Sequence, residues 1–263
     1  MNLGLKGKSV LVLASSKGLG KATAYQFAAE GANVFISSRN KETLEKVKKD
    51  IQEGTGNKNV EYAVCDITNP DSIKQMISTI VETNGTIDVL INNAGGPPAG
   101  SFEDFDDVAW QQAFELNLLS FIRTIREVIP YMKKQGSGHI VNIASSSIKQ
   151  PIDHLILSNT FRTGIVGLAK SLSQELAADN ILINTIGPGK ISTDRILQLN
   201  SKRADELNAS MEKVKSDAEK QIPIGRYGTP EEFAKTVVFL CSGANTYITG
   251  QSLLVDGGMV KAL

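Results

Sequence analysis

The stretch SVLVLASSKGLGKATAYQFAAEG, residues 9–31, decides the fold class of this protein. Its first part, residues 9–14, is a continuous apolar run, which is typical of a strand buried on both faces of a sheet. Its last part, residues 20–31, has helical spacing and ends in a glycine. The turn between them is rich in Gly and Ser, so backbone N–H groups and the positive end of the following helix can hold a phosphate. Short glycine patterns also occur in turns that bind nothing, so the pattern alone leaves both interpretations open.

The same alternation of apolar runs and amphipathic stretches continues along the chain and predicts repeated βαβ units. No linker rich in Pro, Gly or Ser and no internal repeat interrupts it. We therefore expect an α/β fold of one domain, residues 1–263, with a three-layer, Rossmann-type, doubly wound parallel sheet. Further strands are predicted at residues 33–38, 60–66, 87–93, 138–145, 180–186 and 252–256, and further helices at 41–53, 71–84, 106–135, 155–179 and 230–242.

One segment departs from this alternation. Residues 191–222 form a polar helical insertion between the sixth strand and the last helix. In an open parallel sheet, ligands bind beyond the carboxyl ends of the strands, and the insertion leaves one of these ends. We expect it to act as a lid over the site.

The composition narrows the possible functions. Of the 263 residues, 41% are hydrophobic and 21% are charged, which predicts a packed globular core. Lys and Arg total 28, as do Asp and Glu, so nothing indicates binding to nucleic acid or to a membrane surface. Cys65 and Cys241 lie in apolar stretches and are expected to be buried thiols. No apolar run suits a secretion signal or a membrane span, and we expect a cytoplasmic protein.

Two basic residues indicate which nucleotide would bind. The second strand is followed by Arg39, where NAD-binding proteins usually carry an acidic residue that accepts the ribose hydroxyls. Lys17 lies within the glycine-rich turn. Either residue alone could be surface charge, but together they suit a 2′-phosphate, because Arg grips phosphate with two parallel N–H groups. We predict that NADP(H) is preferred over NAD(H) and is bound by Ser16, Lys17, Gly18, Leu19, Gly20, Ser38 and Arg39.

Six ordered motifs carry a family resemblance over nearly the whole chain. They are INNAG (91–95), ELN (115–117), GHIVNIAS (138–145), NTIGPGKIST (184–193), IPIGRYGTPEEFA (222–234) and YITGQSLLVDGG (247–258). With these motifs the sequence resembles the short-chain dehydrogenase/reductase family, most closely the branch similar to β-ketoacyl reductases. The resemblance implies an NADP(H)-dependent oxidoreductase that acts on a small-molecule carbonyl/alcohol pair. It also implies a homo-oligomer, commonly a tetramer.

The resemblance further assigns residues to the cofactor. Asp66 and Ile67 match positions beside the adenine ring, and the segment from Asn93 to Gly95 matches one that lines the ribose. The loop after the sixth strand matches one that runs along the nicotinamide and pyrophosphate. The residues assigned in this way are Asp66, Ile67, Asn93, Ala94, Gly95, Pro188, Gly189, Ile191 and Thr193.

The resemblance also identifies catalytic positions, and two of them depart from the family pattern. Asn117 matches the asparagine that holds a water in the proton relay, and Ser145 matches the serine that hydrogen-bonds the substrate oxygen. Ser158 lies thirteen residues beyond Ser145, at the position where the family has Tyr. Arg162 follows four residues later, where the family has Lys. A third departure is Ala14, where the phosphate loop of the family has its first glycine.

These substitutions change the chemistry that the site can perform. A serine hydroxyl is a poorer acid than a phenol, and Arg162 keeps its proton, although it can hold the nicotinamide ribose and stabilise an oxyanion. His154 could supply the proton, because histidine titrates near neutral pH and would share a helical face with Ser158 and Arg162 if the helix begins by residue 154. The alternative is an exposed histidine at a frayed helix start.

The substrate can be read only in outline. Residues 95–106 and the insertion are expected to line its pocket, where Phe102, Phe105 and Ile152 hint at an apolar portion. Lys190 and Arg195 could orient an anionic substrate, or they could simply be solvated.

Three functions fit these residues. The first is an NADP(H)-dependent oxidoreductase with an altered tetrad. The second is a non-catalytic NADP(H)-binding sensor or subunit that has lost the acid. The third resembles the halohydrin dehalogenases, but these keep the tyrosine and replace the nucleotide site by a halide pocket, so Ser158, Gly18 and Gly20 argue against it.

Overall fold

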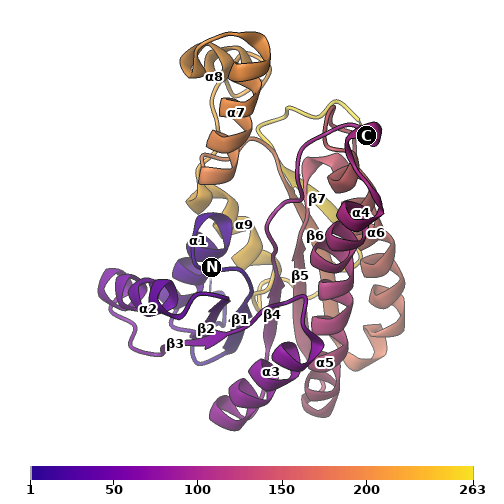
Figure 1. The fold of residues 1–263 in the computed structure, drawn as a ribbon. Coiled ribbons are helices and arrows are strands. Elements are labelled where there is room, and N and C mark those ends of the chain that lie inside the picture. The colour runs from indigo at the N-terminus through magenta and orange to yellow at the C-terminus, as the bar shows by residue number, and fades with distance from the viewer. Residues whose placement is uncertain (1, 263) are drawn as a thin grey trace.

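The computed structural model describes residues 2–262, which form a single α/β domain around a seven-stranded sheet. All strand pairs are parallel, in the order β3-β2-β1-β4-β5-β6-β7, and helices cover both faces (Figure 1). This confirms the predicted Rossmann-type fold. The strands are β1 (Ser9–Val12), β2 (Asn33–Ser38), β3 (Val60–Val64), β4 (Val89–Asn92), β5 (Gly138–Ile143), β6 (Ile181–Pro188) and β7 (Ser252–Val255).

Two apolar layers hold the helices against the sheet. On β1, Val10 and Val12 face one layer, while Leu11 and the following Leu13 face the other, and all four are fully buried. Burial on both faces explains why the strands read as unbroken apolar runs. The first layer is covered by α1 (Gly18–Ala29), α2 (Lys41–Thr55) and α9 (Pro230–Leu240), and the second by α3 (Pro70–Asn84), α5 (Ser120–Gln135) and α6 (Ile156–Glu175).

Capping side chains set the start of several helices. Asn40 accepts a hydrogen bond from the N–H of Thr43 at the start of α2, and Asn69 does the same for the first turn of α3. Thr229 and Glu232 form a reciprocal capping box at α9. These caps satisfy N–H groups that a helix end otherwise leaves without partners.

The predicted helix over residues 106–135 is built of three parts. Helix α4 (Asp107–Phe114) is followed by a π-helical turn (Glu115–Leu119), which leads directly into α5. A π-helical turn inserts an extra residue into a helix and is frequently found at functional sites.

Strand order reverses at β1, which pairs with β2 on one side and with β4 on the other. At such a switch point the connections leave in opposite directions, and a crevice forms beyond the carboxyl ends of the strands. Above this edge stand α7 (Asp194–Leu207) and α8 (Met211–Glu219), drawn in orange in Figure 1. Arg195 and Lys202 of α7 each donate a 2.8 Å hydrogen bond to a backbone oxygen of the loop after β4, at Pro97 and Ala99.

Both cysteines are buried and free, as expected. Burial raises the pKa of both thiols. Across residues 2–262, no helix combines the length and apolarity needed to cross a bilayer.

Ala14 adopts a backbone conformation that favours glycine. Its φ is +45°, and its carbonyl oxygen accepts a hydrogen bond from the Asn93 side chain at 3.2 Å, so the turn keeps its shape without the glycine. A residue with a Cβ in the left-handed region is strained by about 1–2 kcal/mol.

We predict that Ala14→Gly stabilises the protein by about 0.5–1 kcal/mol, because the strain relieved exceeds the conformational entropy that glycine loses on folding. Thermal unfolding should shift upward by about 2 °C. Ala22→Gly, a matched change inside α1, should instead cost about 1 kcal/mol. If both variants lose stability equally, the conformation of Ala14 carries no strain.

Candidate active site

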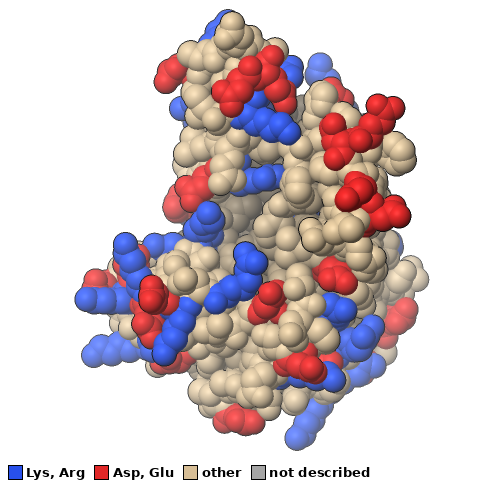
Figure 2. All heavy atoms as spheres, viewed as in Figure 1, with Lys and Arg blue, Asp and Glu red and all other residues tan. Residues whose placement is uncertain are grey.

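A cleft of about 1200 Å³ opens at the carboxyl edge of the sheet, beside α7. Figure 2 shows this hollow with Lys and Arg side chains on both sides. Its volume exceeds that of most sites for a single drug-sized ligand and leaves room for a long one. The predicted site residues that line it are Ser16, Lys17, Gly18, Leu19, Arg39, Asn93, Ala94, Gly95, Ser145, Ser158, Arg162, Pro188, Gly189, Ile191 and Thr193.

Other predicted residues lie off the wall of this cleft: Gly20, Ser38, Asp66, Ile67, Asn117 and His154. Gly20 is packed into the turn, where a Cβ would lie 2.5 Å from the Ala14 oxygen. Asp66 accepts hydrogen bonds from the N–H and the hydroxyl of Thr68, which lower the pKa of its carboxyl group. The Ser38 hydroxyl is buried and has no hydrogen-bond partner in the described part of the chain.

The glycine-rich turn presents open donors to the cleft. Helix α1 begins at Gly18, whose φ of +55° favours glycine, and the preceding Lys17 provides no side-chain cap. The first-turn N–H groups therefore keep their donor capacity, and the positive end of the helix adds to it. Lys17 itself forms an exposed 3.6 Å ion pair with Asp194. This arrangement fits a phosphate group.

Arg39 lies at the same end of the cleft, just beyond β2. Its side chain is exposed, and its charge contributes to the lowered pKa of Asp66. Lys17 and Arg39 thus give this end two cations.

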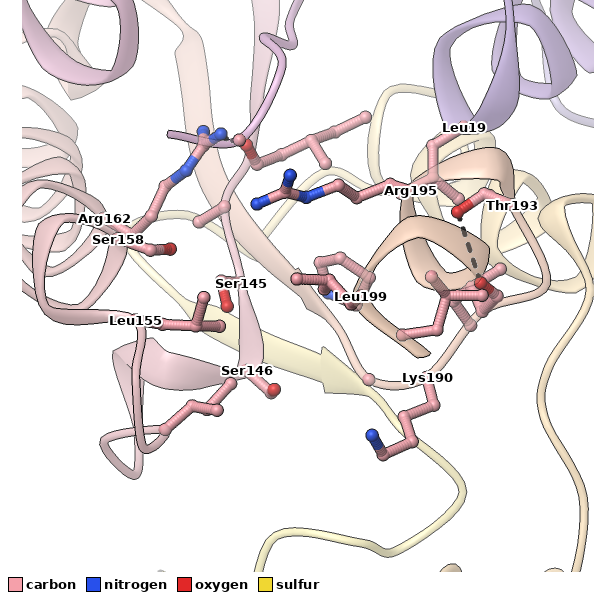
Figure 3. Close-up of a pocket in the computed structure, with 18 of the residues that line it drawn as sticks. Leu19, Ser145, Ser146, Leu155, Ser158, Arg162, Lys190, Thr193, Arg195 and Leu199 are labelled. Carbon is pink, nitrogen blue, oxygen red and sulfur yellow. Dashed lines mark hydrogen bonds between the residues drawn. The ribbon is translucent and has the colours of Figure 1, made fainter. Parts of the chain in front are cut away.

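Ser145, Ser158 and Arg162 meet deeper in the cleft (Figure 3). Ser145 follows the carboxyl end of β5, and its hydroxyl accepts a 3.2 Å hydrogen bond from the N–H of Ser147. Ser158 and Arg162 lie one helical turn apart on α6, and this spacing puts both side chains on one face.

Arg162 is fully enclosed and is held by the backbone. Its guanidinium donates to the oxygens of Ile143 at 3.0 Å and Ala94 at 3.2 Å, and it lies 5.7 Å from the ring centroid of Phe121. Burial, with a further contribution from the charge of Arg195, lowers the pKa of Arg162 to about 10. The side chain therefore remains a cation at neutral pH.

Asn117 lies behind this group, in the π-helical turn. Its side-chain N–H donates to the oxygen of Ala113 at 3.2 Å. Its side-chain oxygen is buried and lacks a partner among residues 2–262. An unpaired buried oxygen of this kind is a ready acceptor for a bound water.

His154 does not share a helical face with Ser158 and Arg162, because the helix does not begin by residue 154, as that prediction required. Helix α6 begins at Ile156, and His154 precedes it with a φ of +58°. The chain here pairs with the loop after β4, because the Gly100 N–H donates to the His154 oxygen and the Ile156 N–H donates to the Gly100 oxygen. The imidazole is exposed, lies 3.2 Å from the Ser101 hydroxyl and borders a smaller neighbouring cavity.

The expectation that Phe102 and Phe105 form an apolar part of the substrate pocket is wrong. Phe102 is 70% exposed and its ring is tilted against that of Trp110, and the Phe105 ring packs against Gly100. Ile152 does line the cleft.

Several cleft residues had no sequence signal strong enough to place them. The apolar part of the wall comes from Leu155 and Leu199, and the C-terminal residues 259–261 close one side. Lys190 and Arg195, for which two interpretations were open, both line the cleft and are partly buried.

Comparison with known proteins agrees with this architecture. A family model described as enoyl-(acyl carrier protein) reductase matches residues 13–260. The chain is 35% identical to a 3-oxoacyl-[acyl-carrier-protein] reductase of Thermotoga maritima, over 97% of this chain and 99% of that protein. It is 34% identical to dehydrogenase/reductase SDR family member 4 of Oryctolagus cuniculus, over 98% of this chain and 96% of that protein.

Solved structures show the same likeness. L-sorbose reductase from Gluconobacter frateurii, complexed with NADPH and L-sorbose, superposes with a TM-score of 0.94 at 30% identity, over the whole of both chains. Actinorhodin polyketide ketoreductase with NADPH gives a TM-score of 0.92 at 32% identity, over 96% of this chain and 97% of that chain. The protein belongs to the short-chain dehydrogenase/reductase family of NAD(P)-dependent oxidoreductases.

We predict that Arg162→Met lowers the free energy of unfolding by about 2 kcal/mol, because two backbone oxygens lose a charged donor. Chemical denaturation measures this change. Arg203→Met, at an exposed arginine that pairs with Glu206, should change stability by less than about 0.5 kcal/mol. A more stable Arg162→Met variant would mean that the desolvation of the guanidinium outweighs its hydrogen bonds.

Proposed function

We propose that the protein is an NADPH-dependent reductase of a small carbonyl compound, similar to 3-oxoacyl reductases, with an atypical tetrad. The observation that carries this proposal is that Ser145, Ser158 and Arg162 meet in the same cleft as the open phosphate-binding turn. The resemblances to a 3-oxoacyl reductase and to two reductases with NADPH support the class of reaction.

The cofactor half of the cleft fits a dinucleotide. The uncapped start of α1 suits the pyrophosphate, and Asn93, Ala94 and Gly95 would lie along a ribose. The loop from Pro188 to Thr193 would border the nicotinamide. Bound NADPH supplies the hydride for the reaction. Asp66, Ile67 and the unpaired Ser38 hydroxyl lie beside this end and would complete the adenosine site.

Lys17 and Arg39 support a preference for NADP(H) over NAD(H). Both line the adenosine end of the cleft, and a 2′-phosphate would bring them the negative charge that an unmodified ribose lacks. The ion pair of Lys17 with Asp194 is long and exposed, so it costs little to exchange for a phosphate.

The chain's own residues would handle the substrate oxygen and its proton. The Ser145 hydroxyl would hydrogen-bond the carbonyl oxygen, and the Arg162 cation would stabilise negative charge that develops on it. Ser158 would hold a water on the same side, while the unpaired Asn117 oxygen would hold another behind it. The product oxygen takes one proton, drawn from water, for each hydride that the carbonyl carbon accepts.

The insertion would act as a lid. Its helix α7 already contacts the loop after β4 through Arg195 and Lys202. Breaking these two hydrogen bonds would open the cleft for cofactor and substrate, and re-forming them would exclude water.

One observation favours a second function, that of a non-catalytic NADP(H)-binding sensor. Among the described residues that line the cleft there is no Tyr, His or Cys, so three of the side chains that commonly donate a proton are missing from its wall. Tight cofactor binding without turnover of any carbonyl would identify this function.

We predict that the protein binds NADPH at least tenfold more tightly than NADH, as measured by nicotinamide fluorescence. Arg39→Ala should weaken NADPH about tenfold to a hundredfold, because a charged hydrogen bond contributes about 1.5–3 kcal/mol. NADH affinity should stay within about twofold.

Lys49→Ala, at an exposed lysine of α2, is the matched control and should leave both affinities unchanged. Equal affinities of the wild-type protein for the two nucleotides would contradict the proposed preference. Binding of neither nucleotide would contradict the proposed function as a whole.

We predict that Ser158→Ala slows carbonyl reduction about tenfold without changing the Kd of NADPH, because the loss of a positioned water affects the chemical step. His154→Ala should keep the wild-type rate within about twofold, since its imidazole lies outside the cleft. Steady-state rates over a panel of ketones test both variants. If only the His154→Ala variant loses most of its reduction rate, the histidine is the proton donor.

A further inference from the structure

Lys190 occupies a distinctive place in the cleft. It follows Gly189 directly at the carboxyl end of β6, and its side chain lines both the main cleft and a neighbouring cavity of about 660 Å³ beneath the insertion. In Figure 3 its amine lies on the side of Ser146, well separated from Leu19 and the phosphate-binding turn. Lys190 therefore lies away from the turn that is proposed to hold the phosphates of the cofactor.

The ammonium group of Lys190 is partly buried without a counter-ion. Burial is the cause of its lowered pKa, and no carboxylate among residues 2–262 forms an ion pair with it. Asp153 lines the same cavity but does not reach the amine, and Asp194 is engaged with Lys17. A cation that burial disfavours and no acidic residue neutralises is suited to an anionic ligand.

A second cation, Arg195, lines the main cleft on a different side from the Lys190 amine. Arg195 reaches across the cleft from α7, so that its guanidinium faces the side where Arg162 lies (Figure 3). One of its terminal N–H groups is bound to the Pro97 oxygen, and burial lowers its pKa as well. Its remaining donors, like those of Lys190, lack a carboxylate partner in the described chain.

Part of the cleft wall is apolar. Ile152, Leu155, Ile196 and Leu199 line both the main cleft and the neighbouring cavity, next to Lys190. Such a wall suits a short hydrocarbon body between a carbonyl group at Ser145 and a charged group at Lys190.

We propose that Lys190, assisted by Arg195, forms an oxyanion-binding subsite, so that the substrate is a small carbonyl compound with a carboxylate or phosphate group. The identification of the bound ligand as a substrate rests on the proposed function. The subsite itself rests only on the two cations that no carboxylate neutralises.

Pairs of probes that share a carbonyl group and differ in the presence of an anionic group test this subsite. Acetoacetate is compared with ethyl acetoacetate, and dihydroxyacetone phosphate with dihydroxyacetone. Both the Kd, by calorimetry with and without NADP⁺, and the rate of NADPH oxidation are measured. We expect the wild-type protein to favour at least one charged probe by roughly tenfold or more, and the preferred pair distinguishes carboxylate from phosphate.

Lys190→Met keeps most of the length of the side chain and removes its charge. The substitution should weaken binding of the charged probe by roughly tenfold to a hundredfold, mainly as a rise in KM. Binding of the neutral probe should stay unchanged. Lys190→Arg should restore much of the loss. Lys220→Met is the matched control, because this lysine also borders the cleft but is exposed and already pairs with Asp217 at 3.1 Å.

Equal binding of charged and neutral probes by the wild-type protein overturns the subsite, as does a Lys190→Met variant that behaves like wild type. Failure of the proposed function looks different. In that case no carbonyl is reduced, while a charged probe still binds in a manner that depends on Lys190.

Discussion

The buried guanidinium of Arg162 is the interaction on which the cleft depends. Its donors join the oxygen of Ile143, at the end of β5, to that of Ala94, in the loop after β4, while its own backbone belongs to α6. Three segments far apart in sequence are thus fixed around one cation. An ammonium group, with donors on a single atom, would reach such separated oxygens less well than a planar fork does. The position of Ser158 one turn earlier follows from the same anchor.

The buried positive charges in the cleft lower the stability of the folded protein. Arg162, Lys190 and Arg195 all have lowered pKa values, and burial is the first cause in each case. The chain as a whole carries equal numbers of basic and acidic residues, so this excess of cations is local. Partly buried cations without counter-ions lower stability unless something else neutralises them. A negatively charged cofactor together with an anionic substrate would do so, and this links the proposed nucleotide preference to the proposed substrate class.

The sequence predicted the sheet well, because strands buried on both faces leave unbroken apolar runs and α1 begins in a turn that few residues other than Gly can form. It predicted the region of His154 badly. The helical spacing of the residues there does not produce a helix, because the main chain pairs with Gly100, some fifty residues away. A local sequence pattern cannot predict such a pairing. Phe102 was also placed wrongly, because its ring lies against Trp110 and remains exposed instead of entering the cleft. The sequence placed Lys190 near the substrate but could not decide between its two interpretations. The lack of a counter-ion becomes apparent only in the folded cleft.

In the proposed function, Ser158 and Arg162 act as one pair rather than as two independent residues. A phenol that donates a proton near neutral pH needs a neighbouring ammonium to lower its pKa, and without the phenol that ammonium has no such role. A guanidinium, whose pKa stays near 10 here even when buried, contributes charge rather than a proton. It can stabilise an oxyanion while water supplies the proton, and a small hydroxyl at Ser158 leaves room for that water. Restoring only one member of the pair would therefore recover neither mechanism, because each depends on the chemistry of its partner.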